Sequence, residues 1–444
     1  MTGFLVCFAV FLTAVIGCIV LDWSLLIAVW LGIAVFFLLG YKQGLPCRTM
    51  AADAWTQGRK MCTLIVIYAL IGTVTALWRG SGTIAFFIYY GLQLIRPELF
   101  LLITFLLTSV VSYALGTSFG VIGTVGVILM ALARSGGVSE VITAGTIVAG
   151  AYFGDRCSPA SSSAALVAAA TGTKLYDNLK HMHRTGWLPY LITLAVYGVL
   201  SVTHPLAALD DSVLAELTAQ FDLSLWTALP ALLILVLPLA KVPIRWAMAA
   251  SALSALLVAV LVQGMPLTTA LRDAVLGYVP AEGALFDVLS GGGVVSMVSA
   301  TLLAISTSLY AGLLGGMGAL DGARHWAGTL ARRWGRFPAC TAVCVASGMV
   351  FCNQSTAPMV AEQLLGDVYQ KEGNGQSELA LDIENSGIVL APLIPWNISV
   401  SIPLAMLDAS PAALPFAVLL YVLPLTYGLT KKHFYHTPER SVSP

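Results

Sequence analysis

Apolar residues occur in long runs along most of the chain, and short polar stretches separate these runs. A run of about 20 apolar residues can cross the roughly 30 Å hydrocarbon core of a bilayer as a helix. The pattern therefore predicts membrane-spanning helices rather than the half-polar helices and strands of a soluble domain. The candidate spans lie near residues 3–20, 23–40, 62–79, 83–96, 99–115, 119–134, 138–154, 187–203, 225–240, 244–263, 295–314, 337–352, 385–407 and 413–430.

Composition supports this interpretation. Of 444 residues, 58% are hydrophobic and 10% are charged, and 22 Lys+Arg balance 22 Asp+Glu. A soluble domain carries about 25% charged residues, and nucleic-acid binding needs a basic surface. The composition excludes a soluble enzyme, a disordered scaffold and a nucleic-acid binder, and it leaves a polytopic protein whose partner is the lipid bilayer.

Several membrane activities lack their sequence signatures. The chain has no GxxxxGK[ST] loop for an ATP-driven pump and no HExxH zinc motif. All six histidines fall outside the apolar runs, which argues against a buried Ser–His pair. A channel would need a symmetric ring of filter segments, which one chain with two unlike halves does not supply. We therefore expect neither an enzyme nor a channel, and no cofactor.

Basic residues mark cytoplasmic loops in membrane proteins. They cluster in 42–60, 174–184, 324–336 and the last 14 residues, whereas 204–224 holds four acidic residues and no Lys or Arg. We expect a bacterial inner-membrane protein with both termini in the cytoplasm and 204–224 as an external linker. The count is 11–13 spans, because 99–134 is either one broken helix or two passes.

Four polar interruptions break the apolar runs: 116–126, 154–163, 352–358 and 382–397. Each half of the chain has a Ser/Thr-rich break followed by a Pro-containing break. Only about 33 residues separate two basic loops around 138–170, which favours a re-entrant hairpin there, and parity places a second hairpin at 379–407. The sequence predicts an all-α inverted repeat with two re-entrant hairpins and two broken helices, in halves 1–203 and 225–444.

Backbone that leaves a helix inside a membrane must line a cavity or be buried in protein. The freed carbonyls and the hydroxyls can then hold a dehydrated cation, because hard cations prefer oxygen ligands. Simpler explanations remain open: Gly116/Gly120 and Gly150/Gly154 also match GxxxG helix packing, and the prolines can be plain kinks.

Three charges lie beside these apolar stretches. Asp155, Arg156 and Glu384 are the informative ones, since charge inside a membrane is functional by default. Asp155 and Glu384 are the candidates for proton coupling. An alternative is that Asp155 and Arg156 form a structural ion pair at the base of a hairpin.

At these interruptions the chain resembles the NhaC family of sodium/proton antiporters. The resemblance rests on GTSFGVIGTVG (116–126), AGAYFGDRCSP (149–159) and ENSGIVLAPLIPWN (384–397). It implies that these regions bind sodium and the exchanged proton or substrate. Some members of the family are thought to exchange organic acids or to carry amino acids with sodium.

The chain departs from the family pattern at three carboxylates. Ser161-Ser162-Ser163 follows the first break where the family places Asp, Thr and Asn; Asn353-Gln354 replaces Asp-Gln; and Glu384-Asn385 replaces Glu-Asp. Neutral oxygens can hold sodium but cannot release protons. The departure therefore strengthens an alternative to sodium/proton exchange, namely sodium- or proton-coupled transport of a small organic acid or amino acid.

The resulting hypothesis is a secondary active transporter that works by alternating access at a cation site near the middle of the membrane. The transported partners are sodium and a proton, with the organic acid or amino acid as the alternative, and a second copy of the chain is left open as a partner. The residues expected to line the site are Thr117, Ser118, Ser158, Ser161, Asn353, Ser355, Thr356, Glu384, Asn385, Ser386 and Asn397.

Overall fold

The fold was analysed in a computed structural model. It describes residues 2–21, 23–60, 62–94, 96–206, 217–240, 242–280, 289–317, 323–370 and 375–434. These residues form helices, turns and one isolated antiparallel bridge between Tyr278 and Gly291, with no strand among them. The all-α prediction is confirmed.

The first half of the chain runs through α11. Short 3-10 and π-helical turns connect several of its helices, and the π-helical turn covers Ile122–Gly126. The α-helices are α1 (Thr2–Val20), α2 (Leu25–Lys42), α3 (Cys47–Lys60), α4 (Cys62–Gly80), α5 (Thr83–Leu94), α6 (Phe100–Leu115), α7 (Ser118–Val121), α8 (Val127–Ser135), α9 (Glu140–Cys157), α10 (Ser162–Thr171) and α11 (Leu175–Thr203).

The second half follows the external linker predicted at 204–224, of which residues 207–216 lie outside the described residues. Its helices are α13 (Leu229–Leu239), α14 (Ile244–Leu261), α15 (Leu267–Leu276), α17 (Val298–Gly316), α18 (Ala323–Trp334), α19 (Arg336–Phe351), α20 (Thr356–Tyr369), α21 (Gly375–Glu384), α22 (Gly387–Leu390), α23 (Ile398–Met406) and α24 (Val418–Phe434).

Helix length and surface chemistry identify a polytopic membrane protein. Among the described residues, 5 helices are long and apolar enough to cross a bilayer, and counting two bent pairs as single spans raises this to 7. Large apolar side chains such as Trp30, Val110 and Leu257 are exposed on the outside of the bundle, as lipid contact requires. Several shorter apolar helices accompany them, so the count of 11–13 spans stays a prediction.

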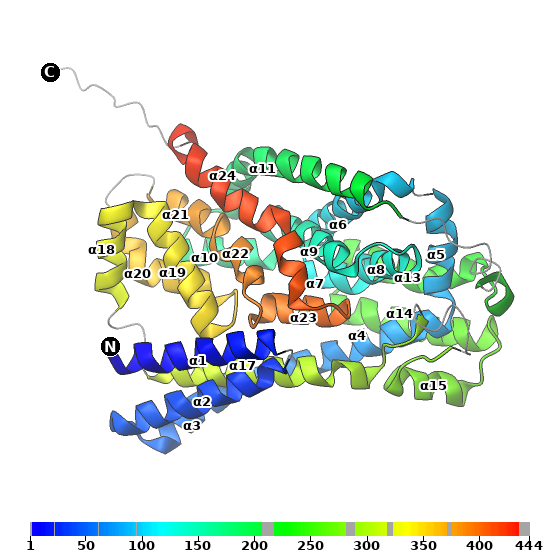
Figure 1. The fold of residues 1–444 in the computed structure, drawn as a ribbon, viewed down its shortest axis with the longest axis horizontal. Helices are drawn as coiled ribbons and strands as arrows, with labels where there is room; N and C mark the ends of the chain where they lie inside the picture. The colour runs from blue at the N-terminus through cyan, green and yellow to red at the C-terminus, as the bar shows by residue number, and fades with distance from the viewer. Residues whose placement is uncertain are drawn as a thin grey trace.

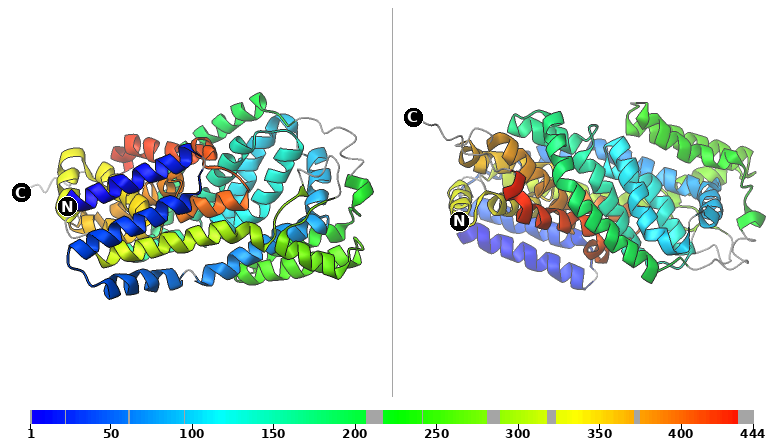
Figure 2. Two further views of the ribbon diagram at one scale, coloured as in Figure 1. Left: turned by 60° about the horizontal axis from the view of Figure 1, so that its bottom comes forward. Right: turned by 90° about the horizontal axis from the view of Figure 1, so that it is seen from above.

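The two halves exchange helices. The first three helices of the chain pack together and against α17 of the second half, while α13, α14 and α15 pack around α4 of the first half (Figures 1 and 2). Each half is therefore covered by helices of the other half. This exchange ties the halves together around a shared interior.

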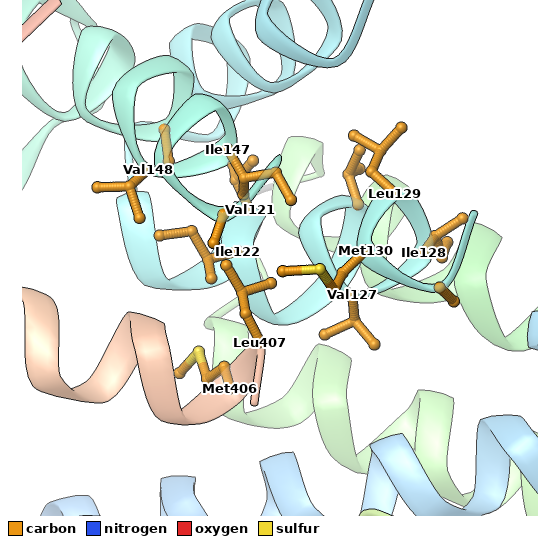
Figure 3. Close-up of a cluster of buried hydrophobic side chains, with 14 of the residues drawn as sticks. Val121, Ile122, Val127, Ile128, Leu129, Met130, Ile147, Val148, Met406 and Leu407 are labelled. Carbon is orange, nitrogen blue, oxygen red and sulfur yellow. The ribbon is translucent and has the colours of Figure 1, made fainter. Parts of the chain in front are cut away.

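The interior of the bundle contains the segment 118–135, which comprises α7, the π turn and α8. Of this segment 83% is buried, against 28–39% of the apolar window in the other four full-length helices. Val121 and Ile122 pack there against Ile147 of α9 and against Met406 and Leu407 at the end of α23 (Figure 3). The first polar interruption thus begins the most enclosed helix of the bundle.

The chain reverses direction at 116–117. Gly150 lies against Thr108 and Gly154 against Ser112, so α9 runs parallel to α6. The intervening segment α7–α8 must therefore run the other way, which makes 99–134 two passes rather than one broken helix. Gly116, at φ 68°, begins the turn. The glycines at 150 and 154 provide close helix packing, as the GxxxG interpretation predicted.

The two predicted re-entrant hairpins stay predictions. In 379–407 the helical segments 375–393 and 398–406 bend by 51° at a short break, as a broken span or a re-entrant loop does. In 138–170, α10 packs against α9 and also against α20 and α21 of the other half. Two tight turns lie outside these segments, at 116–117 and at 352–355, where α19 and α20 pack against each other.

Candidate functional site

The break between α9 and α10 is held by two serines. Ser161 begins α10: its hydroxyl accepts from the Ala164 amide at 3.1 Å and donates to the Asp155 carbonyl. Ser158 donates to the Tyr113 carbonyl at 2.6 Å, which fastens the break to α6. Both hydroxyls satisfy backbone groups that the broken helix would otherwise leave unpaired.

The break between α22 and α23 has the same chemistry. Asn397 begins α23, and its Oδ1 accepts from the amide of Ser399 at 3.0 Å and from its hydroxyl at 2.8 Å. Its Nδ2 donates to the Gly348 carbonyl of α19 at 2.9 Å. Asn397 is fully buried, so these bonds replace those it would make to water.

The turn at 352–355, between α19 and α20, contributes polar groups that mostly form hydrogen bonds within the turn. The Ser355 amide donates to Asn353 Oδ1 at 2.9 Å, and the Thr356 hydroxyl donates to the Asn353 carbonyl at 2.7 Å. Ser355 is exposed. Between α21 and α22, the Ser386 hydroxyl donates to the Asp382 carbonyl at 2.6 Å. These predicted site residues have a structural role in the observed conformation.

Asp155 connects the two halves. Its side chain is 5% exposed, and its Oδ2 accepts from Ser163 at 3.0 Å and from Gln354 Nε2 at 3.4 Å. Gln354 also donates to the Ile388 carbonyl of α22 at 3.0 Å. The break between α9 and α10, the turn between α19 and α20, and helix α22 therefore meet at this carboxylate.

Arg156 is buried between α9, α11 and α21. Its Nε and Nη2 donate to Asn385 Oδ1 at 3.1 and 2.6 Å, and Nη2 also reaches the Met182 carbonyl and Thr185. Asp155 and Arg156 bond to different partners, so the alternative of an ion pair at a hairpin base is not what the structure shows.

Glu384 differs from every other predicted site residue. It is fully buried, and neither carboxylate oxygen has a hydrogen-bond partner among the described residues. Arg156 and Asp155 are close enough to act on it electrostatically. An unpaired buried charge is very costly, so this carboxyl group requires either a proton or a cation close to it.

The remaining two predicted residues, Thr117 and Ser118, lie at the turn between α6 and α7. Thr117 begins α7, accepting from the Gly120 amide at 3.4 Å, and the neighbouring Ser118 interacts with the hydroxyl of Tyr152. Tyr152 also donates to the Ser399 carbonyl, beside Asn397. The first turn thus adjoins the second broken helix, and the four interruptions converge.

The sequence analysis did not single out two participants, Gln354 and Tyr152. Gln354 belongs to the third interruption, beside the predicted Asn353. Tyr152 lies one helical turn before Asp155, on the same face of α9, and that spacing is a usable signal. Asp382 was not singled out either, and its bonds from Tyr369, Tyr427 and Lys431 give it a structural role.

Comparisons with known proteins find antiporters among the relatives of this chain. The Malate-2H(+)/Na(+)-lactate antiporter of Bacillus subtilis (strain 168) is 27% identical over 98% of this chain and 95% of the relative. The Na(+)/H(+) antiporter NhaC of Alkalihalophilus pseudofirmus is 28% identical over 81% and 79%. The arginine/ornithine antiporter ArcD of Halobacterium salinarum is 28% identical over 75% and 70%.

The family profile covers nearly the whole described chain. It matches residues 1–204 and again 150–429, so both breaks, both turns and the buried carboxylates fall inside it. This agrees with the resemblance found in the interruption motifs. The chain belongs to the Na+/H+ antiporter family.

Proposed function

We propose that this sodium/proton antiporter binds its two ions in turn at the buried region around Glu384 and Asp155. The observation that carries the proposal is the buried carboxylate of Glu384, which has no hydrogen-bond partner among the described residues. A proton and a sodium ion each neutralise such a group, and they exclude each other. Exchange at one carboxylate would couple the two ions.

The surrounding oxygens suit a transported cation. Asp155 lies within electrostatic range of Glu384, and its Oδ2 accepts from the Ser163 hydroxyl and from Gln354 Nε2. Oxygen ligands in a flexible shell suit a hard cation that must be released again. Asp155, already bonded to two donors, would assist rather than carry the exchange.

Access would alternate through movement of the two broken helices. Each contacts the other half, and a polar cap begins the helix after each break, Ser161 for α10 and Asn397 for α23. Such breaks let half-helices tilt while the bound ion remains near the middle of the membrane. The proposal includes that the halves 1–203 and 225–444 are inverted repeats of each other.

For location, we propose the bacterial inner membrane with both termini in the cytoplasm. The start of α1 and the end of α24 lie at the same end of the molecule, together with α18 (Figure 1). That helix carries Arg324, Arg332 and Arg333. Basic residues favour the cytoplasmic side.

A second candidate is exchange of a small organic anion or amino acid. A cavity of about 110 Å³ lies beside the first turn, lined by Tyr68, Thr117, Met248, Ile402 and Met406 among others. The Tyr68 hydroxyl is buried and has no partner among the described residues. This space admits a short aliphatic group, since about 150 Å³ admits benzene. Two relatives are named for organic substrates.

Reconstituted protein separates the two candidates. Proteoliposomes containing a pH-sensitive dye should show proton movement when sodium is added outside, and Tyr68→Phe should leave it unchanged. Labelled lactate, malate, arginine and ornithine are then offered under the same gradients. Proton movement with sodium alone supports ion exchange. The second candidate is supported if sodium causes no proton movement and a labelled compound is taken up in a way that Tyr68→Phe weakens.

A further inference from the structure

Arg156 stands next to the proposed exchange site with part of its hydrogen-bonding capacity unused. A guanidinium has five N–H donors. Nε and Nη2 bond to Asn385, Met182 and Thr185, whereas Nη1 is buried and has no partner among the described residues. Arg156 is only 1% exposed, so water does not compensate.

The carboxylate that would complement Nη1 belongs to the residue before Asn385 and is also unused. Glu384 is the residue preceding Asn385, which holds the guanidinium, and both of its oxygens are unpaired. Arg156 and Glu384 act on each other electrostatically without forming an ion pair in this conformation. A rotation of the guanidinium from one residue to its neighbour would pair both.

The wall behind Arg156 is shaped for this group. A Cβ at Gly186 of α11 would stand 2.9 Å from Nη1. Glycine therefore leaves room for the guanidinium beside α11. A larger residue would displace the guanidinium from its observed position.

We propose that Arg156 is a tethered competitor of the transported sodium ion, moving between Asn385, where the structure holds it, and Glu384, which it neutralises when no cation is bound. The inference rests on the proposed function of Glu384. It gives Arg156 a positioning role: sodium binding at Glu384 competes with an internal cation that can reach the same carboxylate.

The test measures sodium binding without transport. The melting temperature of the detergent-purified full chain is followed against sodium concentration, with choline as the control cation. Arg156→Gln removes the competitor and should lower the sodium concentration for half-maximal stabilisation by about tenfold. Gly186→Ala should raise it, and Gly198→Ala on the same helix, where nothing lies within 4 Å, should not change it.

Epistasis provides the second test. Asn385→Ala removes the resting place of the guanidinium and should raise the half-maximal concentration. In the Arg156→Gln background the same substitution should have no effect, because there is no guanidinium left to hold. An effect that persists in that background means that Asn385 binds sodium itself and overturns the proposal.

The remaining outcomes are distinguishable. If the melting temperature of the wild-type protein does not change with sodium, both the proposed function and this inference are overturned. A wild type that responds, with Arg156→Gln unchanged or weaker, removes the inference alone. If Arg156→Gln does not fold, Gly186→Ala and Asn385→Ala decide: both must raise the half-maximal concentration, and a value equal to wild type overturns the proposal.

Discussion

Two carboxylates on α21 are only two residues apart but differ in their hydrogen bonding. Asp382 and Glu384 are both fully buried. Asp382 accepts from Tyr369 at 2.5 Å, from Tyr427 at 2.8 Å and from Lys431 at 2.5 Å, whereas Glu384 accepts from no group among the described residues. Burial alone therefore does not identify an ion site. What distinguishes Glu384 is its unused capacity to accept.

The Asp382 region extends into an ion network. Lys431 of α24 also pairs with Glu378 at 2.6 Å, and Glu378 pairs with Arg336 of α19 at 2.9 Å. Breaking such a buried network is costly because it leaves a charge uncompensated. We infer that this region fixes α21 in place and that Glu384, at the end of the same helix, serves exchange.

The largest expected effect is at Glu384. Glu384→Gln should lower sodium/proton exchange by at least about 100-fold, since the amide can neither take up a proton nor neutralise a cation. Thermal unfolding should be unchanged or shifted upward, because a bare buried carboxylate is removed. Dye-based exchange in proteoliposomes measures the first, and the exposed Glu98→Gln is the control. Wild-type exchange by Glu384→Gln would separate this residue from the mechanism.

Asp382→Asn should lower stability and leave exchange nearly unchanged, the reverse of Glu384→Gln. Removing one member of a buried ion pair costs about 3–5 kcal/mol, and Lys431 retaining Glu378 favours the lower end. Chemical unfolding in detergent should show this loss, while exchange per folded molecule stays within about threefold of wild type. A stable Asp382→Asn protein without exchange would erase the contrast between the two carboxylates.

Asp155 lies between these extremes, with two donors. Asp155→Asn should reduce exchange about tenfold, because hydrogen bonds to a charged group contribute about 1.5–3 kcal/mol while the amide retains part of the geometry. The sodium concentration for half-maximal exchange should rise in the same titration. Ser163→Ala, which removes one donor, is the milder companion, and equal losses in both variants would argue against a role for the charge itself.

The smallest effects concern the two caps. Ser161→Ala and Asn397→Ala should each cost about 1 kcal/mol of unfolding free energy, with the larger loss at Asn397 because it also bonds to α19. Thermal unfolding measures both, and Ser161→Thr and Asn397→Asp are the matched conservative variants. A loss of several kcal/mol at Ser161 would show that the first break depends on its cap more than the second does.

The sequence located the four interruptions but did not settle their geometry. Gly116 and the Ser/Thr residues after it marked a disruption, yet only the parallel packing of α9 on α6 shows that the chain turns back there. In 382–397 the structure shows a bend of 51° between helical segments at the predicted break. Turns and bends share composition, and tertiary contacts decide between them.

The candidate site was predictable where charge was involved. Glu384 and Asp155 stood out because carboxylates beside apolar runs are rare, and the structure buries both. Hydroxyl and amide side chains were ambiguous, because Ser158, Ser161 and Asn397 serve equally well as backbone caps. Gln354 reaches Asp155 from 199 positions away in the chain, a separation that no local pattern encodes.

The π-helical turn at Ile122–Gly126 has a mechanical consequence. A π turn holds one residue more than an α turn, so the buried helix contains one residue of spare length. If the turn migrates along the helix, the segment before it rotates by roughly 100° per residue without breaking the backbone ladder. Thr117 and Ser118 lie in the segment before the π turn, so a shift of the turn would rotate them about the helix axis while α8 keeps its position.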